Sequence, residues 1–294
     1  MAQIMNARGE DVAFSWKSLI PARFRGDRPV IPVVRLAGTI GGGGPLRQGM
    51  TLEAVAGPLG RAFALKSAPA VALIVNSPGG AAAQSHLIFR FIRSLAEEKE
   101  KKVIVAVEDL AASGGYMIAA AGDEIVVDAS SIVGSIGVVS AGFGFTGLIE
   151  RIGVERRVHT AGKSKAMLDP FRPEREEDVA RLRAIHEDVH AAFIDLVRKR
   201  RGSRLADDPD LFSGAFWSGS RAVALGLADR TGDLRSVLRE AYGDGVRLKM
   251  IPIERSMLRR RLGLGASSDR LAAGLVDRVL ATIDEHLAWN RFGL

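Results

Sequence analysis

The sequence predicts an α/β fold in which strands and helices alternate along the chain. Runs of β-branched and apolar residues at 70–75 and 102–107 have the composition of strands buried on both faces. A glycine-containing turn follows each run, and residues 81–96 repeat apolar side chains at helical spacing. Units of this kind favour an open α/β sheet, which places ligands at the carboxyl ends of its strands.

The individual elements follow from the same patterns. The folded body is expected to begin with the β-branched run after Arg28-Pro29, a helix with a threonine start follows, and glycine turns separate the later elements. The expected strands are 30–36, 70–75, 102–107, 124–127, 134–139 and 154–161. The expected helices are 51–65, 81–96, 114–121, 143–152, 174–201, 221–225 and 234–242.

Three regions are expected along the chain. Residues 1–29 are expected to form an irregular amino-terminal arm, 30–252 the main domain and 253–294 a carboxy-terminal helical extension. Between 271 and 287 the extension repeats apolar residues on one helical face, which core, a second subunit or lipid must cover. We favour core or a second subunit.

Composition excludes several classes of function. The chain of 294 residues contains no cysteine, so disulfides, zinc–thiolate sites and thiol nucleophiles are ruled out. Its net charge of +7 comes largely from short arginine-rich pieces without interleaved aromatic residues. We therefore expect no nucleic-acid partner, whereas a peripheral membrane contact stays open.

No export signal or membrane span is expected. Charged residues interrupt the first thirty positions, and the charge-free run 129–149 contains five glycines and four serines. That run is more typical of a buried strand and a loop than of a spanning helix. We expect a cytoplasmic chain, associated with a membrane at most at its surface.

Ser113 is the first candidate for chemistry. It is followed by Gly114 and Gly115 between an expected strand and an expected helix, where a tight turn would expose the hydroxyl and leave backbone N–H groups free. Ser-Gly-Gly is also ordinary turn chemistry. The turn at Gly79 and Gly80 should face it, and together the two turns could stabilise an oxyanion.

A serine nucleophile needs a base. A Ser-His-Asp triad stays open, because it depends on geometry and not on sequence order, but none of the five histidines falls in an expected loop. Lysine is the other recognised partner. A lysine base must be neutral, and a reference pKa of about 10.4 leaves about one lysine in 2,500 deprotonated at pH 7 unless burial lowers the pKa. Lys165 precedes Ala166, Met167 and Leu168, so an apolar setting is expected for it, with Lys163 as a solvated neighbour.

Five blocks in this order resemble the signal peptide peptidase A and SohB-like family of serine peptidases. The blocks are Asn76-Ser-Pro-Gly-Gly80, Ala112-Ser-Gly-Gly-Tyr116, Gly134-Ser-Ile-Gly-Val138, Gly162-Lys-Ser-Lys165 and the stretch from Trp217-Ser-Gly to Gly226-Leu-Ala-Asp229. The resemblance implies that Ser113 is the nucleophile, Lys165 the general base and Ser135 the hydroxyl that orients the lysine amine. It also implies an oxyanion hole built from the turn of Gly79 and Gly80 and from Gly114.

The resemblance carries further expectations. The family's fold is similar to that of the crotonase and caseinolytic protease superfamily, a spiral of β-β-α units that commonly assembles into homo-oligomeric rings. The implied substrates are apolar peptides, such as signal-peptide or membrane-derived fragments, with no cofactor or metal. The chain departs from the family in showing no anchor or export signal, in Ser164 where an aromatic residue is common, and in Met117 where a second aromatic is frequent.

Three rival interpretations remain at this point. The glycines Gly142, Gly144 and Gly147 match the G-x-G-x-x-G pattern of dinucleotide sites, although no acidic residue ends the next expected strand. The two glycine turns could instead polarise an acyl-CoA thioester, with Ser113 incidental. The chain could also be an inactive binding or scaffold relative that keeps the fold.

Overall fold

A largely parallel sheet occupies the centre of the protein. The computed structural model describes residues 28–42, 49–253 and 289–292. The strands are β1 (Val30–Ala37), β2 (Ala70–Ser77), β3 (Lys102–Ala112), β4 (Glu124–Val127), β5 (Ile132–Gly134), β6 (Phe216–Ser218), β7 (Arg230–Thr231) and β8 (Arg247–Met250). The helices are α1 (Leu52–Phe63), α2 (Ala82–Glu98), α3 (Gly114–Ala119), α4 (Thr146–Arg151), α5 (Glu176–Arg201), α6 (Gly219–Ala224) and α7 (Leu234–Tyr242), with a 3-10 turn η2 (Gly202–Arg204) after α5.

The sheet divides along its longest strand. Its main path runs β6-β5-β3-β2-β1-β8, and β4 joins the side of β3 and pairs in turn with β7. The first half of β3 pairs with β4 and its last three residues pair with β5. Among the described strands every pairing is parallel except β5 with β6. The carboxyl ends of β2, β3 and β5 therefore lie at one edge.

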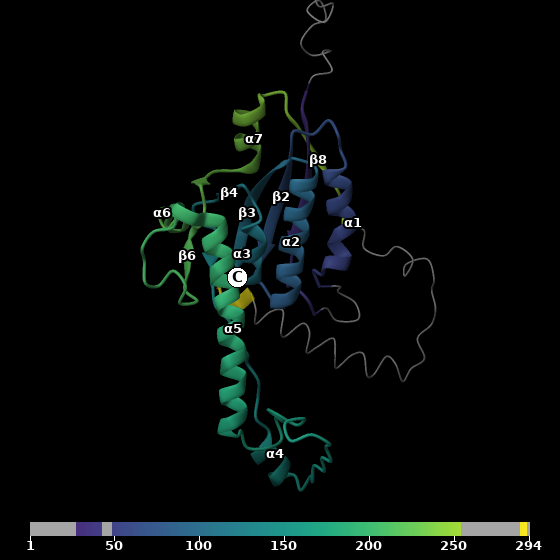
Figure 1. Ribbon diagram of the computed structural model, residues 1–294, viewed down its shortest axis with the longest axis vertical. Helices are drawn as coiled ribbons and strands as arrows, with labels where there is room; N and C mark the ends of the chain where they lie inside the picture. Colours follow the sequence, from purple (N-terminus) through teal and green to yellow (C-terminus); the bar gives the residue numbers. More distant parts are fainter. Residues whose placement is uncertain (1–27, 43–48, 254–288, 293–294) are drawn as a thin grey trace, which may run out of the picture.

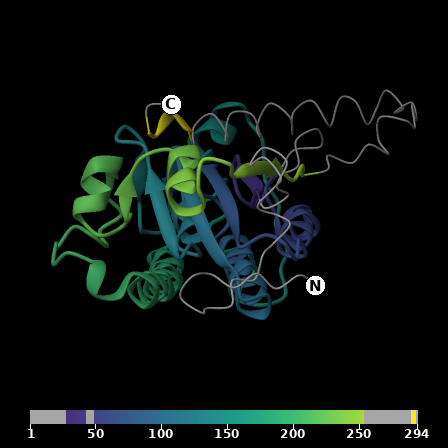
Figure 2. The same ribbon diagram turned by 90° about the horizontal axis from the view of Figure 1, so that it is seen from above.

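Helices cover both faces of the sheet (Figures 1 and 2). Apolar side chains of α1, α2, α3 and α5 pack on one face with alternate residues of β1, β2 and β3. On the other face, α7 packs on the complementary residues of the same strands. The last described segment, Trp289–Phe292, packs against Leu110, Ala112 and Ile132 of β3 and β5 on a smaller cluster. The strands are buried on both sides, as their apolar composition requires.

Helix boundaries follow local chemistry. Thr51 caps α1 by accepting the N–H of Ala54 at 3.3 Å, and Asp233 caps α7 by accepting the N–H of Ser236 at 3.0 Å. In α2 the buried positions include Ile88 and Ile92, one turn apart. These three helices confirm the sequence prediction to within a few residues.

A long excursion spans residues 138–175 between β5 and α5. From here on we call this excursion the arm; it is not the expected amino-terminal arm of residues 1–29. No residue from 139 to 175 is fully buried. The arm contains α4, which lies beyond the amino-terminal end of α5 and away from the sheet (Figure 1). It has contacts of its own: the N–H of Phe145 donates to the carbonyl of Pro170 at 2.6 Å, and the rings of Phe145 and Phe171 lie 5.5 Å apart.

Two expected strands are wrong. β5 ends at Gly134 instead of running through 134–139, because Ser135 has a left-handed φ of 53° that breaks the extended backbone. Residues 154–161 form no strand, since they lie in the arm, where no neighbouring strand offers hydrogen bonds. The expected apolar helical stripe between 271 and 287 lies outside the described residues.

Candidate active site

Ser113 occupies a strained junction between β3 and α3. Its backbone has φ 52° and ψ −123°, a conformation that costs a non-glycine residue on the order of 1–3 kcal/mol. Its N–H donates to the carbonyl of Gly134 at 2.8 Å, which ties the turn to β5. Ser113 is partly exposed whereas Ala112 and Gly114 are buried. The strand therefore turns sharply into the helix and presents the hydroxyl, as nucleophile-bearing turns do.

The two glycine turns face each other, as expected from the sequence. A Cβ added to Gly79 would lie 2.8 Å from both the Gly114 nitrogen and the Ser113 Cβ. A Cβ on Gly80 would collide with the carbonyl oxygen of Ile40. Both glycines have positive φ, 99° and 138°. Only glycine fits this turn, because a side chain at position 79 would press on the amide nitrogen of Gly114.

The backbone amides of the two turns differ in their partners. The N–H of Gly79 donates to the Ser77 hydroxyl at 3.2 Å, and that hydroxyl donates to the carbonyl of Gly38 at 2.7 Å. The N–H groups of Gly80 and Gly114 have no acceptor among the described residues. Two unused donors next to a strained serine are what acyl-transfer chemistry requires for a developing oxyanion.

Helix α3, which carries the amide of Gly114, is fixed at both ends. The Tyr116 hydroxyl donates to the carbonyl of Leu227 at 2.9 Å, and burial raises the pKa of Tyr116 well above its usual range. At the other end, the Arg200 guanidinium donates to the carbonyls of Ala120 and Gly122, both at 2.9 Å. A cation at the helix carboxyl terminus satisfies the last carbonyls and opposes the helix dipole.

Ser135 directly follows β5, as Ser113 directly follows β3. The register pairs Ala112 with Gly134, so the next residue on each strand is one of these two serines. Ser135 is 3% exposed, has φ 53°, and its N–H donates to the carbonyl of Ala215 at 2.7 Å. The structure thus brings Ser113, Ser135 and the two glycine turns to one edge of the sheet.

Lys165 is not brought to this edge within the single chain. Its side chain is exposed in a turn of the arm, as is that of Lys163. Its amine forms no hydrogen bond or ion pair with Ser113, Ser135 or any other described residue. The expected apolar burial of Lys165 is therefore wrong for one copy, because the arm carries the lysine away from the body (Figure 1).

The dinucleotide interpretation of the glycine motif loses its basis. Residues 139–145 are irregular and exposed, and β5 ends well before Gly142. A Cβ added to Gly142, Gly144 or Gly147 would meet nothing within 4 Å. A phosphate-binding turn needs glycines so that its backbone can approach other atoms closely. No such close approach is made at these three glycines.

Two residues of the site escaped the sequence reasoning. Ser77 accepts the N–H of Gly79, and Ser85 is fully buried with its Oγ against Gly114, where an added Cβ would collide. A hydroxyl two residues before a turn amide is a known local pattern, so Ser77 could have been found. The role of Ser85 depends on how α2 packs on α3 and had no local signal.

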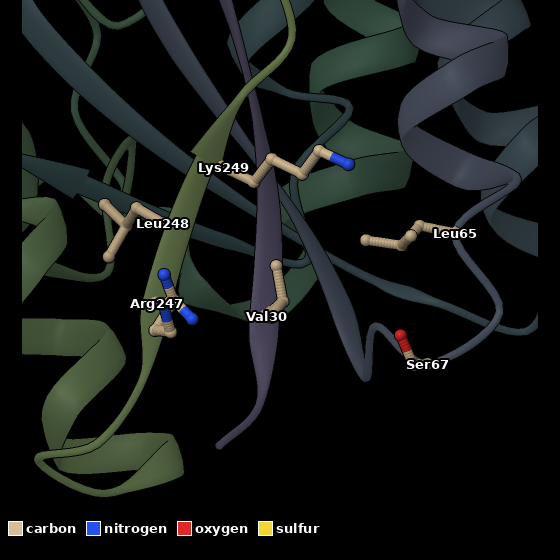
Figure 3. Close-up of a pocket in the computed structure, with 6 residues that line it drawn as sticks. All are labelled: Val30, Leu65, Ser67, Arg247, Leu248 and Lys249. Carbon is tan, nitrogen blue, oxygen red and sulfur yellow. The ribbon is translucent and has the colours of Figure 1, made fainter. Parts of the chain in front are cut away.

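A cavity of about 360 Å³ lies at the other end of the sheet (Figure 3). It is lined by Val30, Leu65, Ser67, Arg247, Leu248 and Lys249. Val30 begins β1 and pairs with Arg247, so this cavity is at the amino ends of the strands, opposite Ser113. It takes no part in the candidate site. In the described part of the chain no group of three or more His, Cys, Asp or Glu side chains could hold a metal ion.

Comparison with known proteins identifies a family that covers this part of the chain. The model of peptidase family S49 matches residues 96–246, which include Ser113, Ser135 and Lys165. The chain belongs to this family.

Three relatives show the range of similarity. The chain is 57% identical over 285 residues to a Na(+)/H(+) antiporter NhaA of Brucella abortus, a match over 95% of this chain and 39% of the relative. It is 32% identical to the chloroplastic serine protease SPPA of Arabidopsis thaliana over 74% of this chain and 34% of the relative. It is 33% identical to protease 4 of Haemophilus influenzae over 72% of this chain and 34% of the relative. The chain thus spans about two fifths of the length of the first of these relatives.

A solved structure of a mutant of the 1510-N membrane-bound stomatin-specific protease matches 76% of this chain and 98% of that chain, at 12% identity and a TM-score of 0.43. Within the described residues, no helix has both the length and the apolar character needed to cross a bilayer.

Proposed function

We propose that the chain is a serine peptidase that uses Ser113 as nucleophile and Lys165 as general base. The observation that carries the proposal is the strained Ser113 between two unused backbone donors. The same family likeness supports the finer fold assignment, a crotonase-like and caseinolytic-protease-like spiral of β-β-α units. Apolar peptides, such as signal-peptide or membrane-derived fragments, are the proposed substrates.

The proposed reaction has two halves. The Ser113 hydroxyl attacks the scissile carbonyl while its proton passes to the neutral Lys165 amine, and the oxyanion accepts hydrogen bonds from the N–H groups of Gly80 and Gly114. The protonated lysine gives its proton to the leaving amine, and an acyl-enzyme ester remains on Ser113. Lys165 then deprotonates water, which releases the acid and restores the serine. Ser135 orients the amine.

Gly79 has a different part in this proposal from its neighbour. Because its N–H is occupied by Ser77, Gly79 contributes space and Gly80 contributes the donor. The sequence assigned both glycines to the oxyanion hole without separating these parts.

We propose further that Lys165 reaches the serine of a second copy in a homo-oligomeric ring. The arm exposes Val139, Phe143, Leu148, Ile152 and Val154, each more than half exposed. An apolar surface of that kind calls for a protein partner. Burial of the arm against a neighbouring body would also supply the apolar setting that a neutral lysine needs.

Mixing two inactive variants tests the arrangement in trans. Ser113→Ala and Lys165→Ala are each expected to lack hydrolysis of a fluorogenic apolar peptide. If the lysine acts in trans, a 1:1 mixture of dissociated and reassembled subunits recovers about one quarter of wild-type activity, because half of the serines and half of the lysines are intact. No recovery in mixed oligomers would place the lysine in the same copy.

Substrate choice separates the remaining interpretations. A peptidase hydrolyses the fluorogenic peptide and leaves acyl-CoA thioesters intact, whereas an acyl-CoA enzyme does the reverse. An inactive scaffold relative turns over neither. Turnover of a thioester that survives Ser113→Ala would overturn the proposed function.

The antiporter-named relatives favour a second candidate, a module that works beside a sodium–proton antiporter at a membrane surface. The chain matches 39% of such a relative at 57% identity. The net charge of +7 would suit a peripheral contact with anionic lipid. Vesicles of phosphatidylcholine with and without phosphatidylserine test that contact by co-sedimentation, and equal, salt-independent recovery from both would exclude it.

A further inference from the structure

Two histidines of α5 hold the segment that joins the body to the arm. His186 and His190 lie one helical turn apart. The His190 Nε2 is 3.0 Å from the carbonyl oxygen of Ile136, and the His186 Nε2 is 2.7 Å from the Ser140 hydroxyl. Both contacts fall on residues 136–140, which follow Ser135 directly. We call this pair of contacts the histidine clamp.

The clamp lies where the arm is joined to the body. Only two stretches make that connection, residues 136–140 on the way out and α5 on the way back. They run side by side from the sheet towards α4 (Figure 1). The His190 contact lies at the body end of the outgoing stretch, next to Ile136, which is fully buried. Movement between the two stretches would change the position of everything that the arm carries, including Lys165.

The clamp also touches the turn of Ser135. The N–H of Gly137 donates to the carbonyl of Ser135 at 3.0 Å, and the Ser135 N–H donates to Ala215. The carbonyl of the next residue, Ile136, accepts the hydrogen bond of His190. The Ser135 N–H is thus bonded to Ala215, just before β6, and the next residue, Ile136, is bonded to His190 of α5.

The chemistry of the contact fixes the tautomer of His190. A carbonyl oxygen only accepts hydrogen bonds, so Nε2 of His190 carries the proton and is the donor in this contact.

We infer that His186 and His190 are positioning residues for the arm. They keep the arm at one orientation relative to the body and hold the Ser135 turn, so that Lys165 is delivered to a catalytic serine. This inference rests on the proposed function for its catalytic consequence, while the orientation of the arm can be measured without activity. Two partly exposed hydrogen bonds contribute only about 1 kcal/mol each to stability, so their main effect should be on geometry.

Spin-label distances measure the arm directly. The chain contains no cysteine, so Glu98→Cys in α2 and Arg157→Cys in the arm introduce the only two labelling sites. Dilution with unlabelled protein isolates the distance within one chain. We expect one narrow distance distribution for the parent protein and a broadened or displaced one for the double variant His186→Leu/His190→Leu. The matched variant His190→Gln retains a donor near Nε2 and should keep the narrow distribution, and His86→Gln in α2 serves as the control.

Kinetics supplies the second measurement, on the chain without added cysteines. The double leucine variant should lose at least about ten-fold in kcat, since small misplacements of a catalytic group are costly, with little change in KM or thermal midpoint. The single variant His190→Gln, which keeps a donor, should have a kcat within about two-fold of wild type. An unchanged distance distribution in the double variant would overturn the inference. The inference would also be overturned if the double leucine variant lost kcat only because its thermal midpoint fell, and if His190→Gln lost kcat as well.

The two proposals fail in different ways. Hydrolysis that does not depend on Ser113 or Lys165 would refute the proposed function, whereas the distance distributions would still decide whether the histidine clamp orients the arm. Hydrolysis that depends on both residues but is indifferent to the histidines would refute the inference alone.

Discussion

Replacing Gly79 with alanine should disable the oxyanion site while leaving the fold intact. The new Cβ would lie 2.8 Å from the Gly114 nitrogen and 2.9 Å from the Ala112 carbonyl oxygen, closer than real Cβ contacts. The positive φ of 99° adds about 1–2 kcal/mol of backbone strain for an L-residue. The new Cβ would block the N–H of Gly114, one of the two proposed oxyanion donors. Loss of one such donor typically lowers kcat by about 10²–10³-fold. We expect a loss in that range in a fluorogenic peptide assay.

Thermal melts set the limits of this prediction. The φ strain of 1–2 kcal/mol alone should lower the midpoint of a domain of this size by about 2–8 °C, and the collision with the backbone of Ala112 and Gly114 lowers it further, so kcat is measured well below the midpoint of the variant. Gly60→Ala is the matched control, because Gly60 is within α1, has no positive φ, and an added Cβ would meet nothing within 4 Å. It should stabilise the helix by about 0.5–1 kcal/mol and leave kcat unchanged. Wild-type kcat in Gly79→Ala would refute the proposed position of the oxyanion.

Two further predictions concern the frame of the site. Burial opposes ionisation of Asp229, but the Arg201 guanidinium at 2.9 Å and the Ile125 N–H at 2.7 Å outweigh it and hold the pKa of Asp229 below its usual value. A lowered folded pKa means that this stabilisation is complete above about pH 4 and is lost as the pH falls through the folded value. Asp229→Asn should therefore lower the free energy of unfolding by on the order of 3 kcal/mol at pH 7. It should also weaken the fall of the melting midpoint with falling pH, and an unchanged dependence on pH would contradict this reasoning. Phe292→Ala in the full chain should lower the free energy of unfolding in urea by about 2–4 kcal/mol. The reason is that Phe292 is 7% exposed and packs edge-on to Phe216, with ring centroids 5.0 Å apart. A cost below about 0.5 kcal/mol would mean that the Trp289–Phe292 segment is not anchored there.

The sequence predicts the body of the fold well because its signals are local. β1, β2 and β3 are apolar, β-branched runs that end in turns, and α7 begins at a capping aspartate. Each of these patterns needs only a few neighbouring residues to be interpreted. The facing of the two glycine turns also follows, since parallel strands end at one edge of the sheet.

The arm could not be predicted in the same way. Residues 154–161 have strand-like composition, yet a strand needs a partner, and the presence of a partner is a property of the whole fold. The exposure of Lys165 has the same origin. An apolar sequence behind Lys165 suggests burial, but the surface that would bury it belongs to no part of the described single chain.

The sequence also could not show which backbone N–H groups near Ser113 are free to donate. Gly79 and Gly80 are equivalent in the sequence, whereas the Ser77 hydroxyl engages only the N–H of Gly79. The strained backbone of Ser113 and of Ser135 was equally hidden, because serine has no preference for positive φ that a sequence could reveal. The sequence predicts which residues belong together, but it does not predict how their backbones and hydrogen-bond partners differ.

Mass spectrometry of the intact protein with a phosphonate ester of an apolar peptide tests the central claim most directly. Such a probe phosphonylates a serine only where a base removes its proton and donors hold the phosphoryl oxygen. We predict one adduct per chain, mapped to Ser113, formed by the wild type and absent from Ser113→Ala and Lys165→Ala. An adduct on another residue, or equal labelling of Ser113 without Lys165, would contradict a Ser113–Lys165 peptidase.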